Sequence, residues 1–257
     1  MSIVHALILS LIEGLTEFLP ISSTGHMILA GKLLGIPSTE FVKSFEIIIQ
    51  LGAILAVVVL YIKTLLQRIS LWPKIITAFF PTAILGFIFY KIIKQFLLGN
   101  SLVTVFALGI GGILFLFLEK FMKDRSFKKK TLEEITYKQA ALIGLTQSIS
   151  MIPGVSRSAA SIFGAMAVGV NRQTAVEFSF LLAIPTMIAA TALDLFKNGF
   201  SFSPGEYQLL IIGFIGAFIT ALIAVKAFLQ FIKSNTFILF AWYRIILAVL
   251  FFIFIIR

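Results

Sequence analysis

Residues 13–26 concentrate two carboxylates, several hydroxyls and an imidazole in an otherwise apolar stretch of sequence. Glu13 and Glu17 are four residues apart, so on a helix they project from one face and can hold a single cation together. Because the chain has no cysteine, oxygen ligands are available and thiolates are not, which favours Mg²⁺ or Ca²⁺. The alternative is that both glutamates pack against Ser, Thr or Arg side chains.

A turn follows the two glutamates. Pro20 ends their helix, and Ser22, Ser23 and Thr24 stand where a new helix would begin. Hydroxyls at that place cap free backbone N–H groups, which also attract anions. We expect His26 to lie in the first turn of the second helix, close enough to Ser22 or Ser23 to exchange a proton. The pattern predicts a cation site beside an anion site, with a candidate nucleophile and base between them, unless the histidine is structural.

A second polar segment occurs in the other half of the chain. Arg157 follows a Pro-Gly pair and is flanked by Ser156 and Ser158. Such a composition suits bidentate binding of phosphate oxygens at a helix start. An arginine near a membrane interface is the alternative reading. Ser158 and Ser161, like Ser22, fit either a capping or a phosphate-binding role.

The composition identifies an integral membrane protein. Apolar residues make up 60% of the 257 positions and charged residues 12%, and the mean hydropathy is +1.07. Long apolar runs favour helices over the alternating strands of a membrane barrel. The net charge of +10 does not indicate nucleic-acid binding, because the basic residues are distributed as membrane topology requires.

The apolar segments predict an all-α polytopic fold with six spans and two re-entrant hairpins. Residues 3–19 with 27–36, and 139–152 with 159–170, form two pairs that are too short for spans of about 20 residues. Broken helices of this kind are tolerated at membrane depth only where protein or a hydrated cavity surrounds them. The predicted full-length spans are 42–62, 74–94, 101–120, 174–195, 207–226 and 236–256.

The order of one hairpin and three spans occurs twice. The sequence Gly-Leu-Thr-Glu at 14–17 recurs as Gly-Leu-Thr-Gln at 144–147. We therefore divide the single membrane domain into repeats 1–122 and 138–257, joined by a basic cytoplasmic loop at 123–137. Since three spans are an odd number, the second repeat enters from the opposite side, and the two hairpins can meet near the midplane. Each ionisable group costs roughly 3 kcal/mol at that depth, which favours their convergence.

The distribution of positive charge predicts the orientation. Loops after the first, third and fifth predicted spans carry about twice as many Lys and Arg residues as the opposite side. The richer side should be cytoplasmic. This places both termini and the mouth of the first hairpin outside.

The two motifs carry a resemblance to a known family. The Glu-x-x-x-Glu run that leads into Leu-Pro-Ile-Ser-Ser-Thr-Gly-His, with the later Pro-Gly-Val-Ser-Arg-Ser, resembles the undecaprenyl-diphosphate phosphatase family of bacterial inner membranes, the bacitracin-resistance type. The resemblance covers essentially the whole chain. It implies hydrolysis of an isoprenyl diphosphate lipid to its monophosphate, which recycles the lipid carrier for cell-wall synthesis, with a divalent metal and an active site that faces the periplasm.

The resemblance also implies roles for individual residues. Glu13 and Glu17 would hold the metal at the catalytic centre, Ser23 would be the nucleophile and His26 its base or acid. A direct attack by His26, or a water activated by it, stays open. The phosphate would be bound by Arg157, assisted by Ser22, Thr24, Ser156, Ser158 and Ser161. The family pattern has glycine and threonine where this chain has Ala159 and Ser161.

Two other functional classes fit parts of the pattern. Inverted repeats with broken helices are typical of secondary transporters, so a transporter or lipid flippase is the main alternative. An intramembrane serine protease is the weaker one, because it needs neither paired carboxylates nor a nearby arginine. Expected partners are membrane lipids and the lipid substrate, and glycine-rich spans are compatible with a homodimer.

Overall fold

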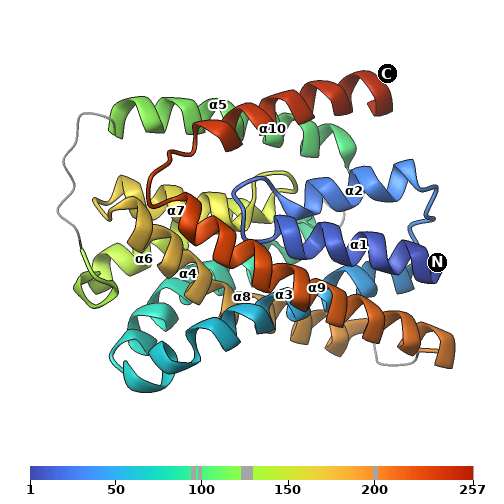
Figure 1. Ribbon diagram of the computed structural model, residues 1–257, viewed down its shortest axis with the longest axis horizontal. Helices are drawn as coiled ribbons and strands as arrows, with labels where there is room; N and C mark the ends of the chain where they lie inside the picture. Colours follow the sequence, from blue (N-terminus) through green and yellow to red (C-terminus); the bar gives the residue numbers. More distant parts are fainter. Residues whose placement is uncertain (94–96, 98–99, 123–129, 199–201, 257) are drawn as a thin grey trace.

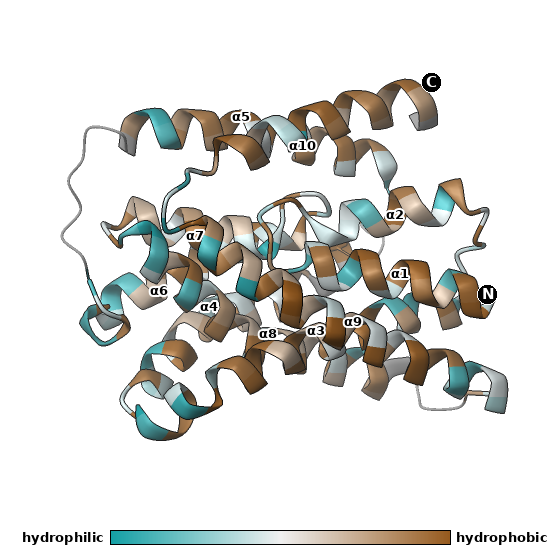
Figure 2. Cartoon of the chain, in the orientation of Figure 1, coloured by the Kyte–Doolittle hydropathy of each residue, from teal (hydrophilic) through white to brown (hydrophobic). Residues whose placement is uncertain are grey.

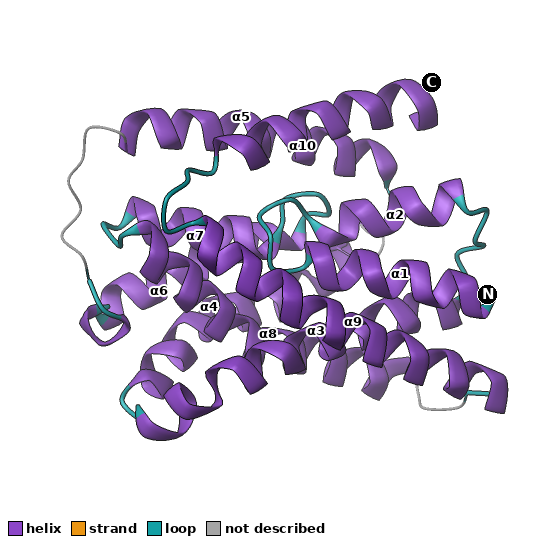
Figure 3. Cartoon of the chain, in the orientation of Figure 1, coloured by secondary structure: helices purple, strands orange, loops and turns teal. Residues whose placement is uncertain are grey.

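The computed structural model of the protein describes residues 1–93, 97, 100–122, 130–198 and 202–256. Over these residues the chain forms helices and no strands (Figure 3). The predicted all-α fold is therefore confirmed for the described residues. Residues 123–129, the first part of the predicted basic loop, lie outside them.

Five helices in the described ranges are long and apolar enough to cross a membrane. They are α3 (Glu40–Gln67), α4 (Leu71–Ile92), α5 (Ser101–Met122), α8 (Arg172–Asn198) and α9 (Pro204–Phe231). They correspond to the first five predicted spans, so the chain is a multi-pass membrane protein. The predicted span 236–256 instead contains a shorter apolar helix, α10 (Ile238–Phe251), which continues into the π-helical turn η4 (Phe252–Ile256).

Shorter helices occupy both predicted hairpins. The first pair is α1 (Ile3–Thr16) and α2 (Ser23–Leu33); the second is α6 (Tyr137–Gln147), the 3₁₀ turn η3 (Ser148–Met151) and α7 (Arg157–Ala167), after a 3₁₀ turn η2 (Leu132–Glu134). Helix α1 packs on α9, and α6 packs on α4. Each hairpin thus packs against a long helix from the other half of the sequence.

Glycine allows both of these contacts. A Cβ atom on Gly14 would lie 2.6 Å from the carbonyl oxygen of Ala217 on α9. A Cβ atom on Gly144 would overlap the carbonyl oxygen of Ala78 on α4. The backbones approach closely because neither position has a side chain. These are the two glycines of the recurring Gly-Leu-Thr sequence, so the sequence match has a packing reason.

The helices surround two turns near the middle of the molecule. Figure 1 shows α5 and α10 side by side along one edge, with α3, α8 and α9 toward the other. The turn between α1 and α2 lies between these groups, and Phe18 in it contacts Phe180 of α8 edge to face, with centroids 5.1 Å apart. The first turn is therefore packed against α8 through Phe18.

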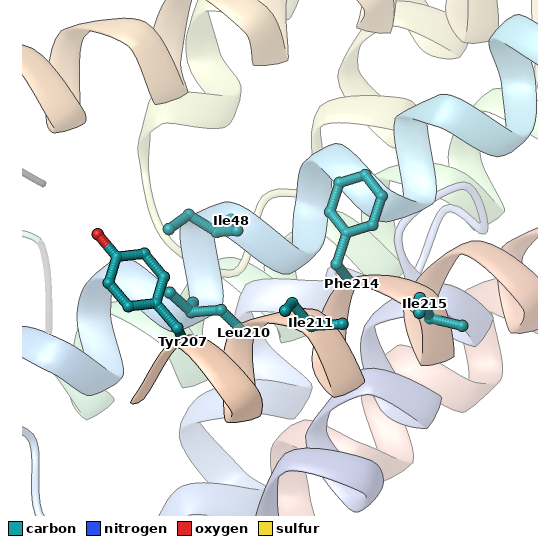
Figure 4. Close-up of a pocket in the computed structure, with 6 residues that line it drawn as sticks. All are labelled: Ile48, Tyr207, Leu210, Ile211, Phe214 and Ile215. Carbon is teal, nitrogen blue, oxygen red and sulfur yellow. The ribbon is translucent and has the colours of Figure 1, made fainter. Parts of the chain in front are cut away.

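The outer surface of the helices is apolar. Figure 2 shows hydrophobic residues along most of the length of the long helices. Phe87 on α4 is 78% exposed, and many other large apolar side chains are exposed with it. Between α3 and α9 lies an apolar groove of about 390 Å³ (Figure 4), lined by Ile48, Tyr207, Leu210, Ile211, Phe214 and Ile215. Such a surface is suited to contact with lipid chains.

Candidate active site

The turn of the first hairpin lies against the start of α7. The hydroxyl of Ser158 donates to the carbonyl oxygen of Leu19 at 2.9 Å, across 139 positions of sequence. The guanidinium of Arg157 lies over the ring of Phe18, 5.4 Å from its centroid. The structure therefore brings the two predicted polar segments together.

Glu17 contacts two other predicted site residues, Ser23 and Arg157. Its Oε1 accepts a hydrogen bond from Arg157 Nη2 at 2.8 Å, and its Oε2 accepts one from the Ser23 hydroxyl at 2.5 Å. Arg157 Nη1 donates to the carbonyl oxygen of Ser179 on α8 at 3.0 Å. Both members of the ion pair are buried. Removing one partner of such a pair costs about 3–5 kcal/mol, so these contacts hold the two hairpins in a fixed relation.

The same region contains buried polar atoms without a partner among the described residues. No N–H or O–H group of the described residues donates to either carboxylate oxygen of Glu13, although the residue is fully buried and its side chain adjoins the carboxyl group of Glu17. Arg157 Nε also lacks an acceptor. Leaving such groups unpaired costs about 1–3 kcal/mol each, and more when they are charged. The site therefore offers free acceptors suited to a cation beside a free donor suited to an anion.

These carboxylates fit a divalent cation only in part. Among the described residues, no three His, Cys, Asp or Glu side chains are placed to hold a metal by themselves. Glu13 interacts electrostatically with Glu17 and Glu46, both acidic, and with Arg157. Mg²⁺ is commonly held by one or two carboxylates and completes its shell with water and substrate phosphate. The free oxygens of Glu13 beside Glu17 fit that kind of site.

Ser22 and Ser156 begin the second helix of each pair. Their φ angles are 70° and 78°, and no other non-glycine residue in the described ranges has a positive φ. The Ser22 hydroxyl accepts from the backbone N–H of Gly25 at 3.4 Å, and that of Ser156 accepts from Ala159 at 3.2 Å. Uncommon backbone conformations of this kind cluster at functional sites. The two helix starts thus have matching local structure.

The remaining predicted phosphate-binding hydroxyls differ in their surroundings. Ser158 is 3.0 Å from the Ser156 hydroxyl. Ser161 donates to the Arg157 carbonyl oxygen at 3.0 Å and lies 2.6 Å from the hydroxyl of Ser179. Thr24 is half-buried in the first turn of α2. Ser158 and Ser161 therefore hold α7 against its neighbours in this structure, a packing role that sequence spacing did not separate from phosphate binding.

Comparison with known proteins identifies the family. The family model described as bacitracin resistance protein BacA matches residues 6–250. The chain belongs to the BacA family. It is 53% identical over 247 residues to an undecaprenyl-diphosphatase of Aquifex aeolicus, with 96% of each chain covered. Identity is 50% to proteins of the same name from a Sulfurihydrogenibium species (98% and 99% covered) and Wolinella succinogenes (98% and 97%).

In this BacA chain, the ring nitrogens of His26 are hydrogen-bonded to groups other than the Ser23 hydroxyl. Its Nδ1 is 2.8 Å from the carbonyl oxygen of Ser22, and its Nε2 is 2.7 Å from the hydroxyl of Tyr243 on α10. Both ring nitrogens therefore have partners other than a serine hydroxyl in this structure, and proton exchange between His26 and Ser22 or Ser23 stays a prediction. Ser23 is instead bonded to Glu17. Glu17 therefore accepts the hydrogen bond of the Ser23 hydroxyl, because the turn brings residue 23 back toward the end of α1.

Arg244 of the BacA chain is a central residue that the sequence motifs do not reveal. It is fully buried and donates five hydrogen bonds, all to backbone carbonyl oxygens. One acceptor is Pro20 in the first turn, and two are Gly154 and Val155 in the second, at 2.9 to 3.2 Å. A single guanidinium on α10 thus holds both hairpin turns. Gly111 and Gly112 on α5 are the sequence signals of close packing here, since a Cβ atom on Gly111 would overlap the guanidinium and one on Gly112 would lie 2.8 Å from the carbonyl oxygen of Ala241 on α10.

The second hairpin of the BacA chain has a neutral residue at the place of Glu17. Gln147 is fully buried, and its Nε2 donates to the hydroxyls of Thr82 and Thr186 at 3.1 Å. An amide needs no charged partner when it is buried. The two hairpins are therefore alike in backbone, while only the first carries carboxylates at these positions.

Proposed function

We infer that this chain is an undecaprenyl-diphosphatase, which hydrolyses the terminal phosphate from undecaprenyl diphosphate. The observation that carries this inference is the buried Glu17 carboxylate, held between Ser23 and Arg157 in a BacA chain. A hydroxyl, a carboxylate and a guanidinium in contact are the groups that phosphoryl transfer through a serine requires. The relatives at 50–53% identity carry the corresponding name.

We propose that Arg157 binds the diphosphate. Its Nε is buried and free, and its Nη2 is shared with Glu17. A guanidinium can bind two phosphate oxygens through adjacent N–H groups and stabilise the charge that develops at the transferred phosphorus. Arg157 begins α7, and Ser22, Ser23 and Thr24 stand at the start of α2, so both helix N-termini add donors for phosphate.

Ser23 is the proposed nucleophile. Its Oγ would form a bond to the terminal phosphorus while the bond from that phosphorus to the bridging oxygen breaks, and its proton would pass to Glu17 Oε2, which already accepts it. The lipid monophosphate leaves at this stage. Water then attacks the phosphoserine and releases inorganic phosphate. His26 is proposed to act as an acid or base toward that water or toward the leaving group. It is not assigned a proton transfer with Ser23.

A divalent cation, Mg²⁺ or Ca²⁺, is proposed to bind at Glu13 and Glu17. The two unpaired oxygens of Glu13 support this assignment. When bound, such an ion would neutralise the repulsion between the carboxylates and the diphosphate. Glu13 would be its main protein ligand, because both oxygens of Glu17 already accept hydrogen bonds.

The proposed setting is the bacterial inner membrane, with six spans, two re-entrant hairpins and the catalytic turns opening to the outside. Matching φ angles at Ser22 and Ser156, and matching close contacts at Gly14 and Gly144, support an inverted repeat. The C-terminal helices α10 and η4 would together form the sixth span. The isoprenyl chain would lie against the apolar outer surface, and a homodimer remains a prediction.

A phosphate-release assay in detergent tests this proposal. The purified wild-type chain, given an isoprenyl diphosphate, should release inorganic phosphate, and a chelator should abolish the release. Ser23→Ala and Arg157→Ala should each reduce kcat by at least about 10²-fold. A transporter would release no phosphate without a gradient. Wild-type turnover by Ser23→Ala would remove that residue from the nucleophile's role.

A further inference from the structure

Tyr243 contacts His26 from the opposite end of the sequence. The Tyr243 hydroxyl lies 2.7 Å from His26 Nε2, and the two rings are stacked with centroids 5.6 Å apart and planes 2° from parallel. Tyr243 is on α10, 217 positions from His26. The pairing fixes both the position and the plane of the imidazole ring.

The second contact of the ring determines which nitrogen carries the proton. Nδ1 of His26 is 2.8 Å from the Ser22 carbonyl oxygen, which can only accept. Nδ1 must therefore be the donor. In the neutral ring Nε2 then has the free lone pair, and the hydroxyl of Tyr243 donates to it. If the ring gains a proton, Nε2 becomes a donor and the same hydroxyl accepts, so both states have a partner.

The position of Tyr243 is itself fixed by the residue that follows it. Arg244 is bonded to the carbonyl oxygens of Pro20 and Val155, on either side of the site. Residues adjacent on one helix cannot move independently by more than small amounts. The hydroxyl of Tyr243 is thus held in place relative to the turn that carries Ser22 and Ser23.

We propose that Tyr243 is a positioning residue for catalysis, which holds the imidazole ring of His26 in one orientation, while the Ser22 carbonyl oxygen leaves Nε2 as the basic nitrogen. The proposal rests on the inferred phosphatase activity and adds to it a residue outside both sequence motifs. Tyr243 acts through His26 and is not assigned a contact with substrate. Its contribution should therefore exist only when His26 is present.

A double-mutant cycle tests this dependence. Tyr243→Phe should lower kcat by about tenfold with KM within about twofold of wild type, because only the alignment of an acid–base group is lost. In a His26→Ala background, Tyr243→Phe should change kcat by less than about twofold. Tyr137→Phe removes the same hydroxyl from an exposed tyrosine on α6 and should behave as wild type. Equal effects of Tyr243→Phe in both backgrounds would overturn the proposal.

A chemical readout tests the contact without relying on activity. Diethyl pyrocarbonate modifies unprotonated imidazole nitrogens, and mass spectrometry resolves His26 from the other histidine, His5. Tyr243→Phe should raise the modification rate of His26 about fivefold, as expected for loss of one hydrogen bond, while His5 is unchanged. An unchanged His26 rate would show that the hydroxyl does not hold the ring. This readout remains informative if the chain proves to have another activity.

Discussion

Ser22 and Ser156 share one uncommon backbone conformation, with φ angles of 70° and 78°, at equivalent helix starts. Each hydroxyl accepts from the backbone N–H three residues later. The two serines therefore combine a stabilising cap with a backbone angle that costs about 1–2 kcal/mol for a residue with a Cβ atom.

This combination predicts that alanine at Ser156 lowers the free energy of unfolding while glycine leaves it nearly unchanged. Ser156→Ala loses the cap and keeps the unfavourable φ, so the free energy of unfolding should fall by about 1 kcal/mol. Ser156→Gly loses the cap but relieves the backbone, and it should be as stable as wild type within about 0.5 kcal/mol. Denaturant unfolding in detergent measures both. If alanine were tolerated better than glycine, the positive φ would not describe the protein in solution.

The Glu17–Arg157 pair should be separable into a structural and a catalytic part. Arg157→Met alone leaves a buried carboxylate and should lower the free energy of unfolding by about 3–5 kcal/mol. The double variant Glu17→Gln/Arg157→Met has no buried charge at this pair and should recover most of that stability. It should nevertheless remain inactive, because the phosphate-binding guanidinium is absent.

The two variants are compared by thermal unfolding in detergent and by phosphate release. Recovery of stability without activity is the expected result. Recovery of both together would mean that Arg157 only holds the hairpins. If the double variant were as unstable as Arg157→Met, the unpaired charge of Glu17 would not be the cause of the instability.

Glu13 should determine the cation dependence of the reaction. Glu13→Gln keeps the size of the side chain and removes the charge, so half-maximal activity should require about 10–100-fold more Mg²⁺ or Ca²⁺. Activity is measured against cation concentration after treatment with chelator. Glu40→Gln, which removes an exposed carboxylate that forms an ion pair with Lys43, is the control. A parallel measurement without substrate is the rise in Tm on adding cation, which Glu13→Gln should weaken.

Features that are local in sequence could be predicted. Hydropathy located α3, α4, α5, α8 and α9, because burial in lipid requires about 20 apolar residues in a row. The segment 236–256 contains the shorter apolar helix α10 followed by the π-helical turn η4, so its assignment as a sixth span stays a prediction. Pro20 and the serines after it marked the break between α1 and α2 for the same local reasons.

The meeting of Glu17 with Arg157 was predictable from the cost of burying each charge alone. The contacts of α10 were not. Arg244 bonds to carbonyl oxygens, which every residue has, so no sequence pattern marks its partners. The contact of His26 with Tyr243 likewise depends on where α10 lies, and spacing within the motif suggested a serine partner instead.

Arg244 and Gly111 give the last prediction. Arg244→Lys supplies a point charge with three donors in place of a planar group with five, and it cannot reach both turns at once. Gly111→Ala does not change the residue at position 244 but introduces a Cβ atom where the Arg244 guanidinium lies. Both variants should therefore displace the turns, lower kcat by about 10²-fold and destabilise the fold by about 2–4 kcal/mol.

Gly31→Ala is the matched control for this pair, because a Cβ atom at Gly31 in α2 meets nothing within 4 Å. It should retain activity and gain up to about 1 kcal/mol of stability from helix propensity. Phosphate release and unfolding in detergent are measured for all three variants. Because the three atoms nearest to a Cβ on Gly111 all belong to the Arg244 guanidinium, loss of activity in Gly111→Ala would arise through Arg244. Normal turnover in both Gly111→Ala and Arg244→Lys would show that the turns hold their geometry without this guanidinium.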